Sequence, residues 1–230
     1  MAATPRRELP VGEKLTYDVS WMGIPVGVGE VEIYEKVREG SREIYRVRAI
    51  AKTNEVLSKL YPVEDRVESD FDAEDFHSVR FRKKLSEGRY RADEETVFDP
   101  AAGKGHYKSL LNGEKKEFSA ASGVMDIVSA FYAFRTRAVK PGGKVDLKVS
   151  SEESDWNVEI DVLSLEHKEM KQGAVDVLVT EPKTRLKGIL YRRGRVWIHF
   201  SADEKRVPIL IQFKTPFGPI VGVLRGFDTL

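Results

Sequence analysis

The fold is indicated first by the stretch Leu15-Thr16-Tyr17-Asp18-Val19-Ser20-Trp21, in which every second side chain is apolar or aromatic. Successive side chains of a β-strand point to opposite faces, so this alternation predicts a strand with one buried face and one solvent-facing face. The same period of two recurs along most of the chain, in residues 45–52, 63–72, 79–85, 145–149, 156–162, 175–179, 196–200 and 207–213.

Turn signals separate these runs, and Asn112-Gly113 is the clearest of them because both residues tolerate positive φ in a tight hairpin. Many short strands joined by short connections favour antiparallel neighbours, since a parallel pair needs a long crossover. The sequence therefore predicts a mainly β protein: a curled antiparallel sheet of many short strands, arranged as a barrel, a half-barrel or a sandwich.

One segment has helical rather than strand periodicity, because Val124, Ile127, Val128, Phe131 and Phe134 repeat at steps of one, three and four residues. We expect a single amphipathic helix at about 122–138, capped by Ser122 and ended before Pro141. The domain organisation follows: residues 1–11 form a flexible N-terminal segment, and residues 12–230 form a single β-rich domain with that helix at its centre.

Two glycines, Gly27 and Gly29, lie on one face of an early predicted strand. Glycine in a strand marks a bend or the close approach of another element. We expect the helix to pack against this face, and the bend can also open the mouth of a cavity.

The composition excludes several classes of function. The net charge is +1, from 38 basic and 37 acidic side chains that are interleaved along the chain, so no basic stripe for a nucleic acid is formed. The absence of cysteine excludes disulfides, thiolate zinc sites and cysteine nucleophiles. No run approaches the roughly 18 apolar residues that a membrane-spanning helix requires.

Motifs for catalysis are also missing. No Gly-x-Ser-x-Gly elbow, phosphate-binding loop or calcium-binding loop occurs. The four histidines are too far apart in the sequence to form a helical zinc site: His77, His106, His167 and His199. We therefore expect no metal site and no cofactor, and the catalytic residues, if there are any, stay unknown.

Three blocks of the chain resemble a family of bacterial exported proteins catalogued as domain of unknown function 3108. They are the opening strand and turn at 12–27, the helix at 126–135, and the hairpin at 197–208 with its aspartate, basic residue and proline. The resemblance extends from residue 12 to about 224. It implies a periplasmic or secreted protein with a curled, largely antiparallel sheet around a helix, similar in fold to the half-barrels that carry lipoproteins across the periplasm. The chain departs from the family pattern because its N-terminus lacks the apolar stretch of a signal peptide.

Within those blocks four charged residues receive a structural interpretation. Asp126 and Arg135 are nine positions apart on one helix and do not face each other. Asp203 and Arg206 bracket a turn, which a side-chain acceptor and a nearby cation commonly stabilise.

The leading functional hypothesis is a non-catalytic protein that binds an apolar or amphiphilic ligand, such as a lipid, an acyl chain or a glycolipid, on the inner face of its sheet. The aromatic content supports it, since aromatic side chains line apolar pockets as well as cores. The expected ligand-binding residues are Tyr17, Trp21, Val28, Phe131 and Trp197. Two alternatives stay open: a carbohydrate-active enzyme acting on a polysaccharide, and an interaction module in an envelope assembly. The sequence does not indicate the oligomeric state.

Overall fold

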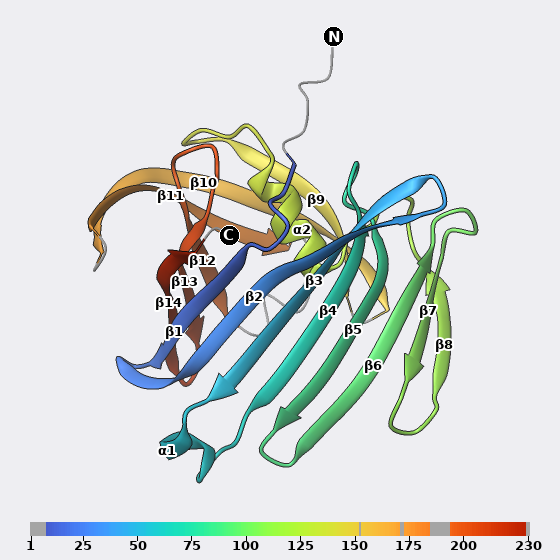
Figure 1. Cartoon of the computed structure of the whole chain (residues 1–230), viewed down its shortest axis with the longest axis horizontal. Helices are drawn as coiled ribbons and strands as arrows, with labels where there is room; N and C mark the ends of the chain where they lie inside the picture. The colour runs from blue at the N-terminus through green and yellow to red at the C-terminus, as the bar shows by residue number, and fades with distance from the viewer. Residues whose placement is uncertain (1–7, 152, 171–172, 185–193, 229–230) are drawn as a thin grey trace.

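The computed structural model describes residues 8–151, 153–170, 173–184 and 194–228 (Figure 1). Its strands form one antiparallel sheet in the order β8-β7-β6-β5-β4-β3-β2-β1-β14-β13-β12-β11-β10-β9, so the predicted curled antiparallel sheet is confirmed. The strands are β1 (Lys14–Trp21), β2 (Ile24–Glu39), β3 (Arg42–Thr53), β4 (Glu64–Asp72), β5 (Ser78–Glu87), β6 (Tyr90–Asp99), β7 (Lys104–Ser109), β8 (Lys115–Ser119), β9 (Lys144–Ser151), β10 (Ser154–Met170), β11 (Gly173–Thr184), β12 (Arg195–Ser201), β13 (Pro208–Thr215) and β14 (Gly218–Asp228).

The first and last strands of the chain pair with each other. β1 runs antiparallel to β14, from Lys14 opposite Asp228 to Trp21 opposite Ile220. Every other neighbour in the sheet is also a neighbour in sequence. The strands β1–β8 form one meander and β9–β14 form a second. The pairing of β1 with β14 joins the two, while β8 and β9 remain as the outer edges and are not paired to each other. The result is an open, barrel-like sheet with a concave and a convex face.

The helix α2 (Ile127–Arg135) is shorter than the segment 122–138 that was expected. Its N-cap is Asp126 and not Ser122, because the Asp126 carboxylate accepts hydrogen bonds from the backbone N–H groups of Val128 and Ser129. Ser122 and Gly123 form a turn before it, and Met125 bridges Val149 of β9 in parallel. A second, single-turn helix, α1 (Glu55–Ser58), connects β3 to β4.

The main core lies between α2 and the concave face (Figure 1). The ring of Phe134 lies 4.9 Å from that of Phe200, and the ring of Tyr132 lies 6.0 Å from that of Phe71. All four side chains are buried. Because β4, β9 and β12 all contribute to this core, the helix ties together strands from both meanders.

The helix packs over the face of β2 that carries Gly27 and Gly29, as expected, since Val31 and Ile33 of that face share a core with Tyr132. The glycines themselves, however, are contacted by neighbouring strands. A Cβ at Gly27 would lie 2.0 Å from the carbonyl oxygen of Lys52, so glycine is required there for the close approach of β3. The atoms nearest to a Cβ at Gly29 belong to Ile50, Tyr17 and Val19 of the neighbouring strands.

The expected flexible segment 1–11 falls partly outside the described residues, which begin at residue 8. The remaining part is packed. Leu9 is buried, and its N–H donates to the Tyr45 hydroxyl at 3.1 Å. Glu8 forms an ion pair with Lys36 at 2.7 Å. These contacts hold residues 8 and 9 against β2 and β3.

Candidate functional site

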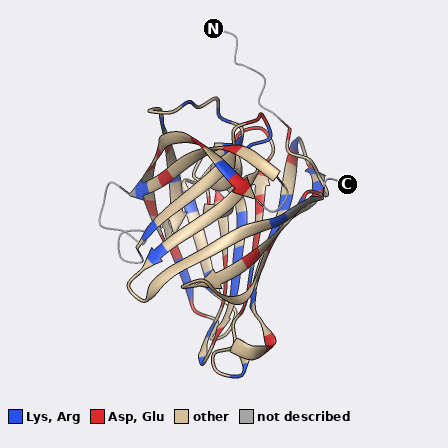
Figure 2. Cartoon of the chain, turned by 90° about the vertical axis from the view of Figure 1, so that its left-hand side faces the viewer, with Lys and Arg blue, Asp and Glu red and all other residues tan. Residues whose placement is uncertain are grey.

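The convex face is hydrophilic over much of its area. Lysine, arginine, aspartate and glutamate recur along the strands in Figure 2 and form cross-strand ion pairs such as Lys52–Glu64 at 2.8 Å and Arg225–Asp18 at 2.5 Å. Exposed pairs of this kind contribute little to stability, roughly 0–1 kcal/mol each. Their effect is to make the outside compatible with water, which leaves the concave face as the candidate site for an apolar ligand.

The concave face is filled at one end and open at the other. Near α2 its side chains are fully buried, as for Tyr45 and Val47 of β3. Further along the same strand, towards α1, Ala49 is half-buried and Ala51 is exposed although it lies on the same face. Val19 and Ile211 of this face are also half-buried. The packing of the core therefore stops below the helix and leaves apolar surface within reach of solvent.

Two further glycines lie on the concave face. Gly29 is opposite Tyr17, and Gly222 is opposite Val19. A Cβ would have its nearest neighbour at 3.9 Å in Gly29 and 3.8 Å in Gly222, which is ordinary contact, and in both cases the Tyr17 side chain is among the nearest atoms. Neither site thus requires glycine for backbone approach, in contrast to Gly27. Gly222 is buried and Gly29 is half-buried, so Gly29 is the one that borders the open part.

The concave face becomes charged towards the β8 edge. Lys83 is opposite Val67 of the same face and forms an ion pair with Glu94 at 2.9 Å. The ammonium of Lys116 lies 5.2 Å from the ring of Tyr107. An apolar floor beside polar groups is the arrangement that an amphiphilic molecule requires.

Three of the five predicted ligand-binding residues lie on the concave side or at its rim. Tyr17 is buried, and its hydroxyl donates to the carbonyl of Pro208 at 2.9 Å. Burial raises the pKa of the Tyr17 phenol, which keeps that donor protonated. Phe131 is half-buried against Phe200, with ring centroids 5.7 Å apart. Trp21 is 39% exposed at the end of β1.

The other two predicted residues face outwards. Val28 is opposite Asp18 and Lys52, on the face away from Gly29. Trp197 alternates with the core residue Ile198 and lies beneath the guanidinium of Arg195, 4.6 Å from the ring centroid. The structure therefore does not bring the five residues together in one pocket. Sequence reasoning missed Ala51, Gly222 and Ile211, which the strand parity of Tyr17 and Gly29 would have indicated.

A buried polar cluster fixes the start of α2 above this face. The Asp126 carboxylate accepts from Ser69 Oγ at 2.7 Å and from Ser78 Oγ at 2.5 Å, in addition to its two helix N–H donors. Burial raises the pKa of this carboxyl, and the hydrogen bonds oppose that shift. Because its partners come from β4, β5 and α2, the cluster orients the helix; all its oxygens are occupied, so it serves structure.

A buried ion pair fixes the other end of the helix. Arg135 contacts both carboxylate oxygens of Glu13, with Nη1–Oε1 at 2.5 Å and Nη2–Oε2 at 2.8 Å. Its Nε also donates to the carbonyl of Arg206 at 3.1 Å. The predicted turn role of Asp203 is confirmed, since its carboxylate accepts from the N–H of Arg206 at 3.2 Å. The four charged residues interpreted as structural thus hold elements together.

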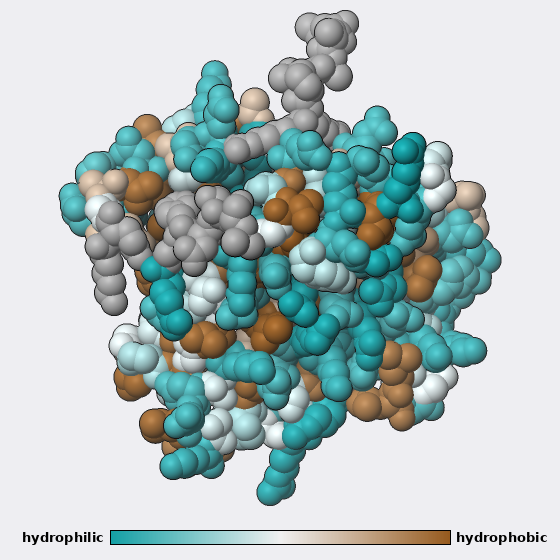
Figure 3. Space-filling view, in the orientation of Figure 1, coloured by the Kyte–Doolittle hydropathy of each residue, from teal (hydrophilic) through white to brown (hydrophobic). Residues whose placement is uncertain are grey.

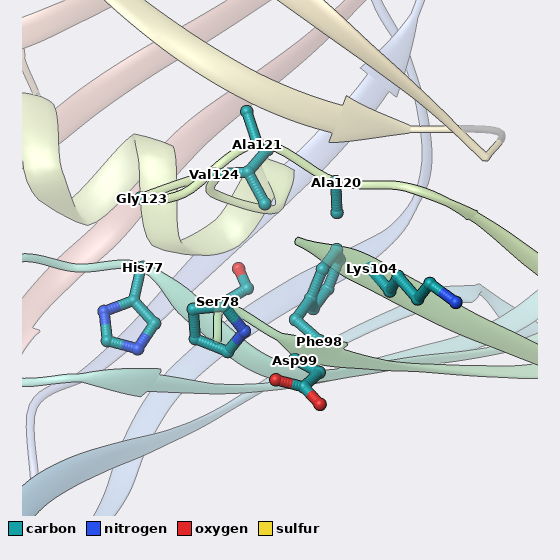
Figure 4. A pocket seen from close by; sticks show the side chains of 10 residues that line it. His77, Ser78, Phe98, Asp99, Lys104, Ala120, Ala121, Gly123 and Val124 are labelled. Atoms are coloured by element: carbon teal, nitrogen blue, oxygen red, sulfur yellow. The ribbon is translucent and has the colours of Figure 1, made fainter. Parts of the chain in front are cut away.

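A cavity of about 10 Å³ lies where the segment before α2 crosses β5 and β6 (Figure 4). Phe98, Asp99 and Lys104 face Ala120 and Val124 across it. This is room for about one water molecule and not for a substrate.

Among the described residues, Asp72, Asp75 and His77 have potential metal-ligating atoms within 4.8 Å of one another. These atoms are engaged in local bonds. Asp72 Oδ1 accepts from the N–H of Glu74, His77 Nδ1 contacts Asp75, and His77 Nε2 lies 3.2 Å from Arg42 Nη1. The guanidinium next to the imidazole disfavours a cation, so the cluster is best explained as a stabilised turn between β4 and β5.

A hollow of about 470 Å³ lies along β6, β7 and β8. It is lined mainly by charged side chains, of which Glu117 pairs with Lys104. Its apolar or aromatic side chains are Val97 and Tyr107, so the concave face remains the stronger candidate.

Fold and site together define the class: an open, β-barrel-like protein whose concave face is only partly filled by its own helix. The chain belongs to the family described as "Protein of unknown function (DUF3108)", whose model matches residues 16–225. It is similar in structure to a beta-barrel-like protein of domain of unknown function DUF1849 from Brucella abortus, with a TM-score of 0.60 and 12% sequence identity, over 97% of this chain and 100% of that one. At this identity the likeness shows the fold alone. No curated protein matches the chain. In its described residues, no helix has the length and apolar character needed to cross a membrane.

Proposed function

We propose that the protein binds an apolar or amphiphilic molecule, of the lipid, acyl-chain or glycolipid class, on the open part of its concave face. The observation that carries this proposal is the inner-facing apolar surface that the core leaves uncovered, at Val19, Ala49, Ala51 and Ile211. Each CH₂ group buried there contributes about 0.8 kcal/mol, so an acyl chain that covers this surface gains enough to be retained.

The charged side of the same face suits a polar headgroup. Lys83 and Glu94 form an ion pair beside Val67 of the same face, and Lys116, which pairs with Glu114 and Glu153, lies further towards the β8 edge. A purely apolar ligand makes no use of these charges, whereas the headgroup of an amphiphile can hydrogen-bond to them. We therefore favour an amphiphile over a hydrocarbon.

We also propose a periplasmic or secreted location. Its support is the resemblance of the three blocks to exported proteins. Fractionation of the native host with an antibody to the protein tests it: enrichment with cytoplasmic markers would contradict the location but leave the ligand proposal intact.

Native mass spectrometry of the protein purified from expressing cells, before and after organic extraction, tests ligand binding. We expect an added mass of lipid size that extraction removes. As a control for weak binding, extracted protein is incubated with a fluorescent fatty acid. An apo mass together with no saturable probe binding would contradict the proposal and favour the polysaccharide enzyme or the envelope scaffold.

A further inference from the structure

Exposed apolar side chains gather at one end of the sheet. In an antiparallel meander successive turns alternate between the two ends, so the turns after β1, β3, β5 and β7 share one end. The turn between β13 and β14 lies there too, because Trp21 is opposite Ile220. We call residues 21–24, 54–63, 87–91, 110–115 and 213–218 the rim.

The rim holds eleven of the 17 large hydrophobic side chains that are exposed in the described part of the chain. Leu60 is 84% exposed, Phe217 81% and Val56 77%. Figure 3 shows hydrophobic side chains at the lower left and lower right of the molecule, separated by hydrophilic ones, where Figure 1 has the β1–β2 turn and the β7–β8 turn. The other six are Val11, Tyr34, Val97, Ile127, Leu163 and Leu165. Single exposed apolar residues are ordinary, but their collection at one end of a protein marks an interaction surface.

The rim is held in shape by contacts between neighbouring turns. The indole N–H of Trp21 donates to the carbonyl of Phe217 at 2.9 Å, and the N–H of Met22 donates to that of Pro219 at 2.9 Å. Gly88 donates to the carbonyl of Pro62 at 2.8 Å. These bonds present the apolar side chains outwards as a fixed group, so their exposure is part of the folded structure.

Charge at the rim is biased towards the positive. Within the rim the acidic residues are Glu55, Glu87 and Glu114, and they are outnumbered by Lys59, Arg89, Arg91, Lys115 and Lys214. Over the whole sequence the two signs balance within one charge. Aromatic and aliphatic side chains mixed with lysine and arginine are typical of surfaces that lie in the interface of an anionic membrane.

We propose that the rim docks onto a bilayer that contains anionic phospholipid. A flat partner can contact several turns at once, which suits apolar groups spread over five separate turns better than a compact protein epitope does. The open part of the concave face begins next to the rim, since Ala51 of that face is two residues from Thr53, where β3 ends and the rim begins. Docking would therefore bring the proposed binding face against the bilayer. The docking proposal does not depend on the proposed ligand. Only the idea that a ligand passes between the bilayer and the concave face rests on the proposed function.

Flotation with vesicles tests docking. We expect the protein to bind phosphatidylcholine vesicles that contain about 30% phosphatidylglycerol, and to bind pure phosphatidylcholine more weakly. Leu60→Ser/Phe217→Ser should weaken binding by about tenfold or more, because two rim side chains no longer enter the interface. The matched control Ile127→Ser/Leu165→Ser removes two exposed apolar side chains away from the rim and should bind like the wild type.

A second readout is local to the rim. Brominated phospholipid should quench the fluorescence of a Trp156→Phe/Trp197→Phe variant, in which Trp21 of the rim is the one tryptophan left. Absent flotation, or equal binding by the rim and control variants, would overturn the proposal. So would a wild-type dimer in light scattering that Leu60→Ser/Phe217→Ser dissociates, because the rim would then face a second copy. Native mass spectrometry of the rim variant keeps the two proposals separate: retained ligand with lost flotation leaves the binding face intact.

Discussion

Glu13 and Arg135 form a bidentate ion pair with both side chains buried, although 122 positions separate them in the chain. Glu13 precedes the first strand and Arg135 is the last residue of α2, so one contact connects the start of the sheet to the end of the helix. The carbonyl of Arg206 adds the β12–β13 turn to the same site.

The first prediction concerns this pair. Arg135→Met leaves the Glu13 carboxylate buried without its partner and should lower the free energy of unfolding by about 3–5 kcal/mol. Glu13→Leu/Arg135→Met removes both charges and should recover most of that loss. Urea denaturation measures both variants, and Glu30→Gln, which breaks the exposed pair with Lys14, serves as a control with a cost of at most about 1 kcal/mol. A double variant no more stable than Arg135→Met would contradict this account.

The second prediction concerns the N-cap of α2. Asp126→Ala removes the acceptor for two helix N–H groups and two buried serine hydroxyls, so the free energy of unfolding should fall by at least about 2 kcal/mol. Asn54→Ala at the N-cap of the exposed helix α1 is the matched control and should cost about 1 kcal/mol or less. Denaturation of the two variants compares the caps directly; equal losses would show that burial of the cluster contributes nothing.

The third prediction is a pH dependence that arises at His199. This residue is buried, its Nε2 contacts Gln212 Oε1 at 3.2 Å, and burial lowers its pKa. The folded protein therefore binds a proton less readily than the unfolded chain, whose histidine has a pKa of about 6.5. The stabilisation is complete above that value and is lost as pH falls through the lower folded pKa.

His199→Gln removes this titration. The unfolding free energy of the wild type should fall relative to that of His199→Gln as pH is lowered from about 8 to about 5. Taking the difference cancels the other histidines and the carboxylates. A difference in unfolding free energy that does not change with pH would contradict the prediction.

The fourth prediction concerns the concave face. Gly29→Leu/Ala51→Leu places two larger side chains at paired positions in the uncovered part of the concave face and should weaken the binding of a fluorescent fatty acid by about tenfold, or 1.4 kcal/mol. Val28→Leu adds one methylene to the adjacent residue on the convex face and should leave the affinity unchanged. Circular dichroism checks that both variants fold. Undiminished binding by Gly29→Leu/Ala51→Leu would place the ligand elsewhere.

Strand parity could be read from the sequence, whereas the identity of the concave face could not. The alternation in residues 15–21 and 207–213 predicted β1 and β13 correctly. Val28 and Trp197 were nevertheless expected inside. The periodicity says only that Val28 faces away from Gly29, and hydrophobic residues occur on both faces of this sheet. Which face curls inwards is decided by the helix, whose contacts with β4 and β9 are long-range.

The helix bounds illustrate the same limit. Val124 fits the helical period, yet its carbonyl accepts from the N–H of Ser78 and Met125 bridges Val149, so tertiary pairing replaces the first predicted turn. The two serines that donate hydrogen bonds to Asp126 could not be identified from the sequence, since Ser69 and Ser78 are 57 and 48 positions away. The charged residues of the helix were correctly interpreted as structural, but the partner of Arg135 could not be identified without the fold.

The position of β14 has a consequence for the order in which the molecule is made. The strand that covers the edge of β1 is synthesised after the 13 other strands of the described sheet, at residues 218–228. Until it is made, the nascent chain carries two separate meanders with unpaired edges at β1 and β13. Such open edges invite pairing with foreign chains. Closure of the sheet between β1 and β13 therefore waits for this eleven-residue strand.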